Sequence, residues 1–210
     1  LAGVGVVFFL ALLAKENAVT FLAVVPLTLY FFSKVNIRQI IVSSLPLLVA
    51  FFLYFLLRTE AVGFGTGEPA DDVLNNPFAL ATPSELLATK IFIMLLYLKL
   101  LLLPWPLSYD YSFYQIPYQD FNDPLVLLSL LVHGGLLVWA FMNFKNRHIL
   151  SYAILYYFIT ISIVSNFVVD IGATMGERLL YVSSFGFALA MGYLLFRLYE
   201  KIAQKGQPSA

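Results

Sequence analysis

The chain has 210 residues, of which 61% are hydrophobic and only 11% are charged. A globular domain has about 45–50% apolar and about 25% charged residues, so a soluble fold of this size could not bury so much apolar surface. Twelve basic residues balance twelve acidic ones, and cysteine is absent. These values exclude a cytosolic enzyme, a nucleic-acid-binding protein, a disulfide framework and a cysteine nucleophile, and they indicate that lipid surrounds most of the chain.

Seven apolar runs predict helices, at 1–14, 17–32, 40–57, 86–103, 125–142, 149–166 and 179–198. A helix needs roughly 20 apolar residues to cross a hydrocarbon core of about 30 Å. The runs do not alternate polar and apolar residues as barrel strands do. We therefore expect an all-α, polytopic membrane helix bundle over 1–198, with about six or seven membrane helices, and a polar tail or linker at 199–210.

The beginning of the chain lies inside the first apolar run. No Met, basic segment or cleavage site precedes Leu1, so the run does not resemble a signal peptide. We expect the chain to be a piece of a longer membrane protein.

The segments between the apolar runs differ in charge. The stretches 33–39 and 143–148 and the segment from 197 onward hold seven basic residues and one acidic residue, and the positive-inside rule predicts that they face the cytoplasm. The loops 58–85 and 104–124 are acidic and are expected to be extracytoplasmic. The run 86–103 between them carries Lys90 and Lys99. It either is re-entrant or interfacial, which we favour, or crosses the membrane against the charge rule.

Two charged pairs stand at the ends of apolar runs. Lys15-Glu16 is either a neutralising pair in a tight helical hairpin or part of a polar site near the membrane surface. Glu177-Arg178 opens the last run, where an Arg opposes the helix dipole. A bound phosphate would explain Arg178, and the alternative is an ion pair with Glu177 or Asp170.

The loop 104–124 combines aromatic and acidic side chains, among them Tyr109, Asp110 and Tyr111. Such residues suit sugar binding, because rings stack on sugar C–H faces and carboxylates bind hydroxyls. Aromatic residues are also common anchors at membrane interfaces, so both interpretations stay open. His133 is expected to be a buried, hydrogen-bonded histidine, and two histidines predict no metal cluster.

Four segments occur in order: LLAKENAVTF, NPFA, YLKLLLLPWPLSYDYSFYQIP and SNFVVDIGATMGERLLYVSSFGF. Together they resemble the membrane region of the transmembrane and tetratricopeptide-repeat O-mannosyltransferases and their bacterial relatives, which have GT-C-type architecture. Gly176 and Ser183 depart from the Ala and Pro usual in that family. The matching positions are Lys15, Glu16, Pro104, Leu107, Asp110, Ser112, Ile116, Pro117, Ser165, Asn166, Glu177, Arg178, Leu180, Tyr181, Ser184, Gly186 and Phe187.

The resemblance implies a bacterial inner-membrane enzyme that transfers a mannose-like sugar from a polyprenyl-phosphate carrier to an acceptor, a protein or glycan, on the extracytoplasmic face. It implies catalytic acidic residues before Leu1 and tetratricopeptide repeats after Ala210, so we expect no activity from this piece alone. No metal or other cofactor is assigned. The expected phosphate-binding residues are Arg178, then Arg58 and Lys15, supported by Glu16, Glu177, Asn166 and Tyr181, with Tyr109, Asp110 and Tyr111 in the acceptor or sugar loop.

Two alternatives come from other classes of protein. In a transporter or flippase, Lys15-Glu16, His133 and Glu177-Arg178 would line a translocation path, although the sequence shows no paired repeats. A purely structural membrane subunit would not need the ordered motifs.

The charge distribution yields a test of topology. In this cysteine-free chain, single cysteines at Asp72 and Asp120 should react with an impermeant thiol reagent from the extracytoplasmic side, whereas one at Asn146 should not. Labelling at Asn146 with protection at Asp120 would mean that 86–103 crosses the membrane.

Overall fold

The computed structural model describes residues 2–63, 76–109, 111 and 115–205, and within these ranges every regular element is helical. The all-α prediction is confirmed for this part of the chain. The 3₁₀ helices η1 (Glu16–Thr20) and η2 (Glu177–Leu180) lead directly into α2 and α7. The α-helices are α1 (Ala2–Ala14), α2 (Phe21–Phe32), α3 (Ile37–Val62), α4 (Pro83–Leu102), α5 (Pro124–Met142), α6 (Ile149–Ser162) and α7 (Tyr181–Lys205).

The starts of three helices follow from capping residues in the sequence. Asn36 and Gln39 form a reciprocal capping box at α3, and Thr82 and Glu85 form another at α4. The Asp123 carboxylate accepts the Leu125 amide at the start of α5. Each cap gives a partner to an amide that would otherwise lack one at the first turn.

The helix of the predicted run 40–57 continues to Val62, and two further helix ends were also predicted wrongly. The run 149–166 stops being helical after Ser162, and Asn166 has a φ of 60°, which a right-handed helix cannot contain. The last helix continues past 198 to Lys205, so the first part of the expected polar tail is helical. Near this end of α7, Arg197 and Glu200 form an ion pair, since residues three apart lie on one face of a helix.

Three helices are long and apolar enough to cross a membrane: Ile37–Ala61, Pro124–Met142 and Glu177–Gln204. The segments Gly3–Ala14, Glu16–Phe32 and Ile149–Ser162 are apolar but shorter. Large apolar side chains on α3, including Phe52, Leu53 and Leu56, are exposed. These features indicate association with a membrane, because water would not favour so much exposed apolar surface.

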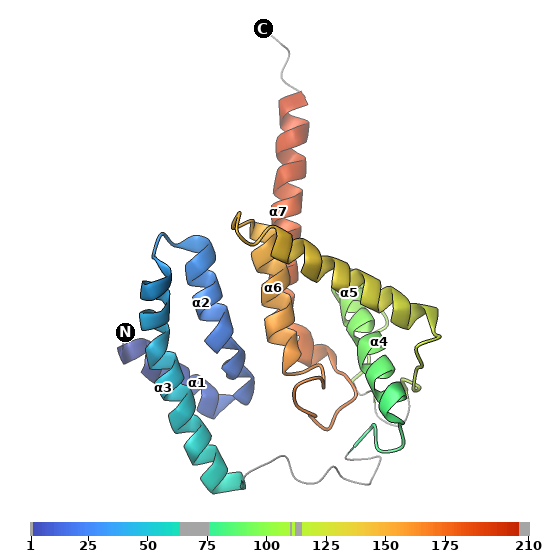
Figure 1. The fold of residues 1–210 in the computed structure, drawn as a ribbon. Helices are drawn as coiled ribbons and strands as arrows, with labels where there is room; N and C mark the ends of the chain where they lie inside the picture. Colours follow the sequence, from blue (N-terminus) through green and yellow to red (C-terminus); the bar gives the residue numbers. More distant parts are fainter. Residues whose placement is uncertain (1, 64–75, 110, 112–114, 206–210) are drawn as a thin grey trace.

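The α6 helix is central, because α2, α5 and α7 all pack against it (Figure 1). The α1 and α2 helices pack on α3, and α4 packs on α5. The α2–α3 and α5–α6 turns lie at one end of the molecule, toward which the later part of α7 also extends (Figure 1). The basic stretches 33–39, 143–148 and 197–205 therefore gather at one end, whereas the α1–α2 junction, the start of α4 and the loop after α6 lie at the other.

The segment after α4 returns to the first half of the same helix. The Tyr118 hydroxyl donates to the Pro77 carbonyl over 2.9 Å, and the Gln119 amide donates to Thr89 Oγ1 over 2.9 Å. The segments on both sides of α4 are thus joined to each other.

The α6 and α7 helices approach each other closely at Gly186. A Cβ atom at this position would lie 2.6 Å from the Ala153 carbonyl oxygen, which is backbone and cannot move aside easily. Nearby, the Thr160 hydroxyl donates to Ser183 Oγ over 3.0 Å, and both side chains are buried. At this point of the α6–α7 interface, small side chains and a buried hydrogen bond therefore allow the two backbones to lie close together.

A methyl group at Gly186 should force these helices apart. We expect Gly186→Ala to destabilise the protein by about 1–3 kcal/mol, the usual cost of overpacking. The measurement is thermal unfolding in detergent.

The matched control is Gly192→Ala on the same helix, where an added Cβ would meet nothing within 4 Å. It should be neutral or slightly stabilising, because Ala favours a helix by about 1 kcal/mol over Gly. Equal melting temperatures for the two variants would contradict the assigned interface.

Candidate functional site

Glu177 joins two motifs that are distant in the sequence. Its Oε1 atom accepts a hydrogen bond from the Ser108 amide over 2.8 Å and another from the Tyr111 hydroxyl over 2.7 Å. Burial, followed by the neighbouring Glu177 carboxylate, raises the pKa of Tyr111 to about 12. The phenol therefore remains a hydrogen-bond donor over the whole physiological pH range. One carboxylate thus attaches the loop after α4 to the turn that begins the last helix.

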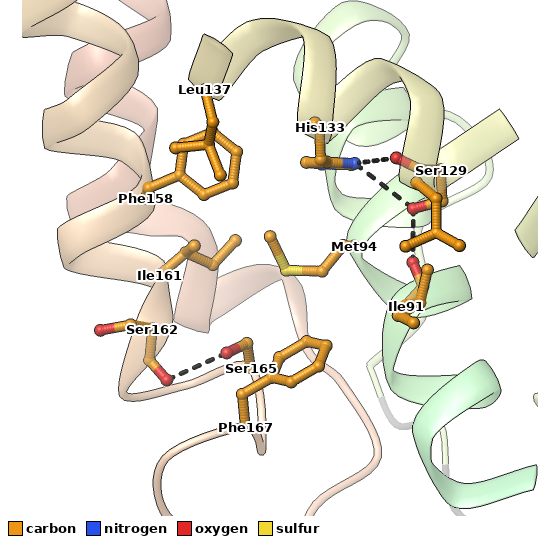
Figure 2. Close-up of a pocket in the computed structure, with 12 residues that line it drawn as sticks. Ile91, Met94, Ser129, His133, Leu137, Phe158, Ile161, Ser162, Ser165 and Phe167 are labelled. Carbon is orange, nitrogen blue, oxygen red and sulfur yellow. Dashed lines mark hydrogen bonds between the residues drawn. The ribbon is translucent and has the colours of Figure 1, made fainter. Parts of the chain in front are cut away.

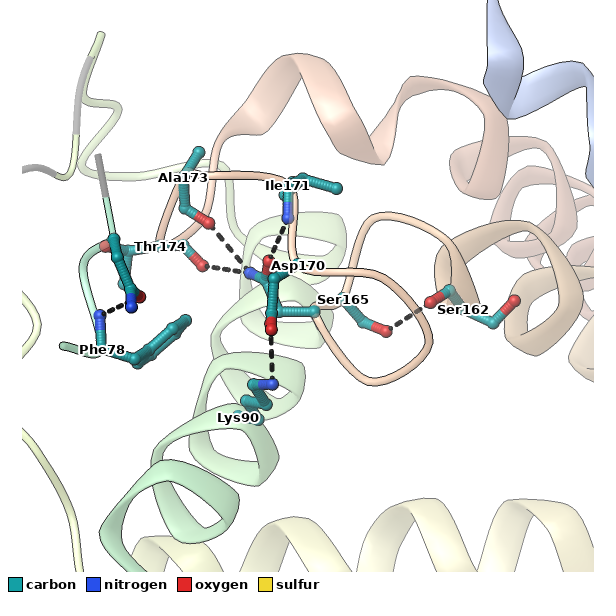
Figure 3. Close-up of polar contacts among 10 residues, drawn as sticks. Phe78, Lys90, Ser162, Ser165, Asp170, Ile171, Ala173 and Thr174 are labelled. Atoms are coloured by element: carbon teal, nitrogen blue, oxygen red, sulfur yellow. Dashed lines mark hydrogen bonds and ion pairs between the residues drawn. The ribbon is translucent and has the colours of Figure 1, made fainter. Parts of the chain in front are cut away.

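The loop 163–176 between α6 and η2 is held by Asn166. The Asn166 side-chain amide donates to the carbonyls of Ala173 (2.9 Å) and Thr174 (3.3 Å), and its oxygen accepts the Ile171 amide (Figure 3). Asn tolerates the left-handed conformation better than most residues, and here its side chain is buried. Asn166 therefore positions the backbone that leads to Glu177.

The far end of this loop is attached to α4. The Gly176 amide donates to the Tyr97 hydroxyl over 3.2 Å, and Tyr97 is fully buried. Tyr97 packs in the core and also accepts the hydrogen bond of the amide immediately before Glu177.

Lys90 and Asp170 form an ion pair beside the loop, with Nζ 2.9 Å from Oδ1 (Figure 3). Lys90 is buried and lies 5.6 Å from the centre of the Phe78 ring, whereas Asp170 is largely exposed. The sequence marked Lys90 as unusual for a lipid-facing helix but did not assign its partner. Its charge is compensated at the same end of the molecule as Glu177.

Arg178 is exposed and makes no hydrogen bond or ion pair with any residue that the structure describes. The alternative that it pairs with Glu177 or Asp170 is wrong, because these carboxylates bind the Ser108–Tyr111 segment and Lys90. Tyr181, three residues later, is 82% exposed. Residues three apart in a helical turn lie on the same side, so a cation and a phenol face outward together.

The other charged motif faces a cavity. Glu16 pairs with Arg58 rather than with Lys15, so the expected neutralising Lys15-Glu16 pair is wrong. Lys15 is exposed, and its side chain has no hydrogen bond or ion pair among the described residues. A cavity of about 350 Å³ lies between the end of α3, η1 and the loop 163–171, and its lining residues with polar groups are Glu16, Asn17, Tyr54, Arg58 and Thr59.

The residues predicted to form the acceptor or sugar loop differ in exposure and contacts. Tyr109 is 99% exposed, whereas Tyr111 is held by Glu177. Asp110 lies outside the described residues. Tyr111 is therefore a positioning residue for the loop, and Tyr109 is free to contact a ligand.

Among the described residues, no group of three or more His, Cys, Asp or Glu side chains could hold a metal ion. Comparison of the chain with models of known families, with curated proteins and with solved structures finds no match.

The Glu177 contacts predict how the loop after α4 is held. Hydrogen bonds to a charged group contribute about 1.5–3 kcal/mol. We expect Glu177→Ala to accelerate hydrogen exchange of the Ser108 amide by about tenfold, and Glu177→Gln to do so less, because its amide oxygen can still accept.

The measurement is hydrogen exchange read by mass spectrometry across residues 103–118. The control, Glu200→Ala, removes an acid of α7 whose partner is Arg197, and it should leave exchange in this segment unchanged. Unaltered Ser108 exchange in Glu177→Ala would show that other contacts hold the loop.

Proposed function

We propose that this chain is part of a multi-pass membrane glycosyltransferase that uses a polyprenyl-phosphate sugar as donor. One observation carries the proposal: the segments on which the family resemblance rests converge at one end of the helix bundle. Glu177 binds Ser108 and Tyr111, and the cavity that contains Glu16 and Arg58 borders the loop 163–171. Such proximity is what a shared binding site would require.

The distribution of charge supports an extracytoplasmic position for this end. The basic stretches 33–39, 143–148 and 197–205 lie at the opposite end (Figure 1), which the positive-inside rule assigns to the cytoplasm. In a bacterium, the proposed location is the inner membrane. The return of the segment after α4 toward Thr89 supports the interpretation that 86–103 is re-entrant or interfacial.

The proposed reaction requires a cation beside the departing phosphate. The acceptor oxygen attacks the anomeric carbon of the sugar, the bond from that carbon to the phosphate oxygen breaks, and its electron pair remains on the lipid phosphate. A base, expected before Leu1, takes the acceptor proton. A cation placed where the negative charge develops lowers the barrier.

Arg178 is the first candidate for this cation. Its side chain is exposed and has no partner among the described residues, and the residue lies in the short helix η2 that leads into α7. Arg58 is second, because Glu16 already compensates its charge. Lys15 is third. Tyr181 and Tyr109 are exposed aromatic residues that could contact lipid or sugar.

The positions of the charges favour this proposal over a translocation path. Glu16, Arg58 and Glu177 lie at one end of the bundle, near loops, rather than midway between helices. A transporter binds its substrate near the middle of the membrane. His133, within α5, is the one member of the proposed path away from this end.

The guanidinium of Arg178 should determine donor affinity. A charged hydrogen bond contributes about 1.5–3 kcal/mol, or one to two orders of magnitude in affinity. In the full-length protein, we expect Arg178→Ala to weaken binding of a short-chain polyprenyl-phosphate mannose by about 10- to 100-fold. Arg178→Lys should weaken it less, because Lys keeps the charge but loses the two-pronged contact.

The measurement is equilibrium binding in lipid nanodiscs, with protein abundance followed in parallel. Arg197→Ala is the matched control, because Arg197 is on the same helix but near its other end, paired with Glu200. It should bind the donor normally. Normal binding by a folded Arg178→Ala variant would overturn the assignment of Arg178 and make Arg58 the leading candidate.

A further inference from the structure

A second cavity, of about 450 Å³, lies between α4, α5 and α6, and none of the candidate site residues lines it. Met94, Leu137, Phe158, Ile161 and Phe167 give it an almost wholly apolar wall (Figure 2). Its volume is within the range of about 300–1,000 Å³ typical of ligand sites. Its polar lining comes from His133 and three serines.

His133 is fixed in one orientation by the preceding turn of α5. Its Nδ1 atom is 2.9 Å from the Ser129 carbonyl oxygen and 3.3 Å from Ser129 Oγ (Figure 2). The Ser129 hydroxyl is itself committed as a donor to the Ile91 carbonyl. A carbonyl oxygen only accepts hydrogen bonds, so Nδ1 must carry the proton.

The second ring nitrogen then has a defined role. In the neutral ring with a proton on Nδ1, Nε2 is an acceptor with a free lone pair. His133 is only 8% exposed, and Nε2 is buried without a partner among the described residues. A buried polar atom without a partner costs free energy, and this cost is recovered when a ligand donates a hydrogen bond.

The serines do not offer the same opportunity. The Ser162 and Ser165 hydroxyls donate to the carbonyls of Ile159 and Ser162. Each serine hydroxyl thus already has a partner, whereas Nε2 has none among the described residues. The site combines a largely apolar wall with one buried polar atom that lacks a partner, which favours an apolar molecule that carries one donor.

We propose that this cavity binds a single-chain lipid alcohol, such as a fatty alcohol or a monoacylglycerol, with its hydroxyl donating to His133 Nε2. The alkyl chain lies against the apolar wall, and the surrounding lipid is the source of the ligand. An ester or ether oxygen cannot replace the hydroxyl, because it only accepts. The site is separate from the proposed donor site and does not depend on it.

The adjacent glycines provide matched variants. Gly134 lines the cavity and Gly135 does not, and a Cβ atom at either position would meet nothing within 4 Å. Gly134→Leu should therefore fill the cavity without disturbing His133, whereas Gly135→Leu adds the same side chain outside it. His133→Phe keeps a ring of similar size and removes the acceptor.

The test uses a dodecanol that carries a photoreactive diazirine, and its methyl ether, each added to the full-length protein in lipid nanodiscs. Photolabelling of α5 and α6 is mapped by mass spectrometry. The alcohol should half-saturate at a concentration about 3- to 10-fold lower than the ether, as expected for one hydrogen bond. His133→Phe should abolish this difference, Gly134→Leu should abolish labelling by both probes, and Gly135→Leu should change neither.

Equal labelling by alcohol and ether in the unaltered protein would overturn the role of Nε2. Equal loss of labelling in Gly134→Leu and Gly135→Leu would overturn the cavity as the binding place. Neither result would affect the proposal for Arg178, which concerns a phosphate at another part of the molecule.

Discussion

The backbones of α6 and α7 can approach closely because Gly186 has no side chain, and the candidate site depends on this contact. A Cβ there would meet the Ala153 carbonyl oxygen at 2.6 Å. The contact fixes the first turns of α7 beside α6, and α6 in turn contacts α2 and α5. Glu177, which lies immediately before α7, is thereby held where it can bind Ser108 and Tyr111. Gly186, within the bundle, thus helps to position Glu177 at the end of the bundle.

The helices and the loops of this molecule satisfy their backbone polar groups in different ways. Along the helices, apolar side chains face outward and the backbone is satisfied internally, as lipid requires. At the end that carries Glu177, loops replace helices, and side chains must satisfy the backbone instead. Asn166 binds three backbone groups, and Tyr97 binds a fourth. This dense hydrogen bonding makes an irregular segment rigid enough to support a binding site.

The two cavities differ in the chemistry that they offer. The cavity beside Arg58 and Glu16 has charged groups in its lining and lies near the loops. The cavity beside His133 lies among three helices, and its lining is nearly all apolar. Charge near a membrane surface suits a phosphate or a sugar, whereas a single neutral acceptor within an apolar wall suits a lipid hydroxyl. The lipid-alcohol proposal rests on the low polarity of the second cavity, whereas the donor proposal rests on the charged motifs that meet at one end of the bundle.

The sequence alone determined the helical class, the approximate position of every helix and the separation of basic from acidic connections, because hydrophobic runs and charge are local properties. It also singled out Glu177, Arg178, Lys15 and Glu16. It could not assign partners, since any carboxylate can pair with any cation and the choice depends on distance in space. Only the tertiary structure paired Asp170 with Lys90 and Glu16 with Arg58, and left Arg178 without a partner among the described residues. The end of α6 at Ser162 was also decided there, because the Asn166 side chain stabilises a turn through backbone groups five to eight residues further along the chain.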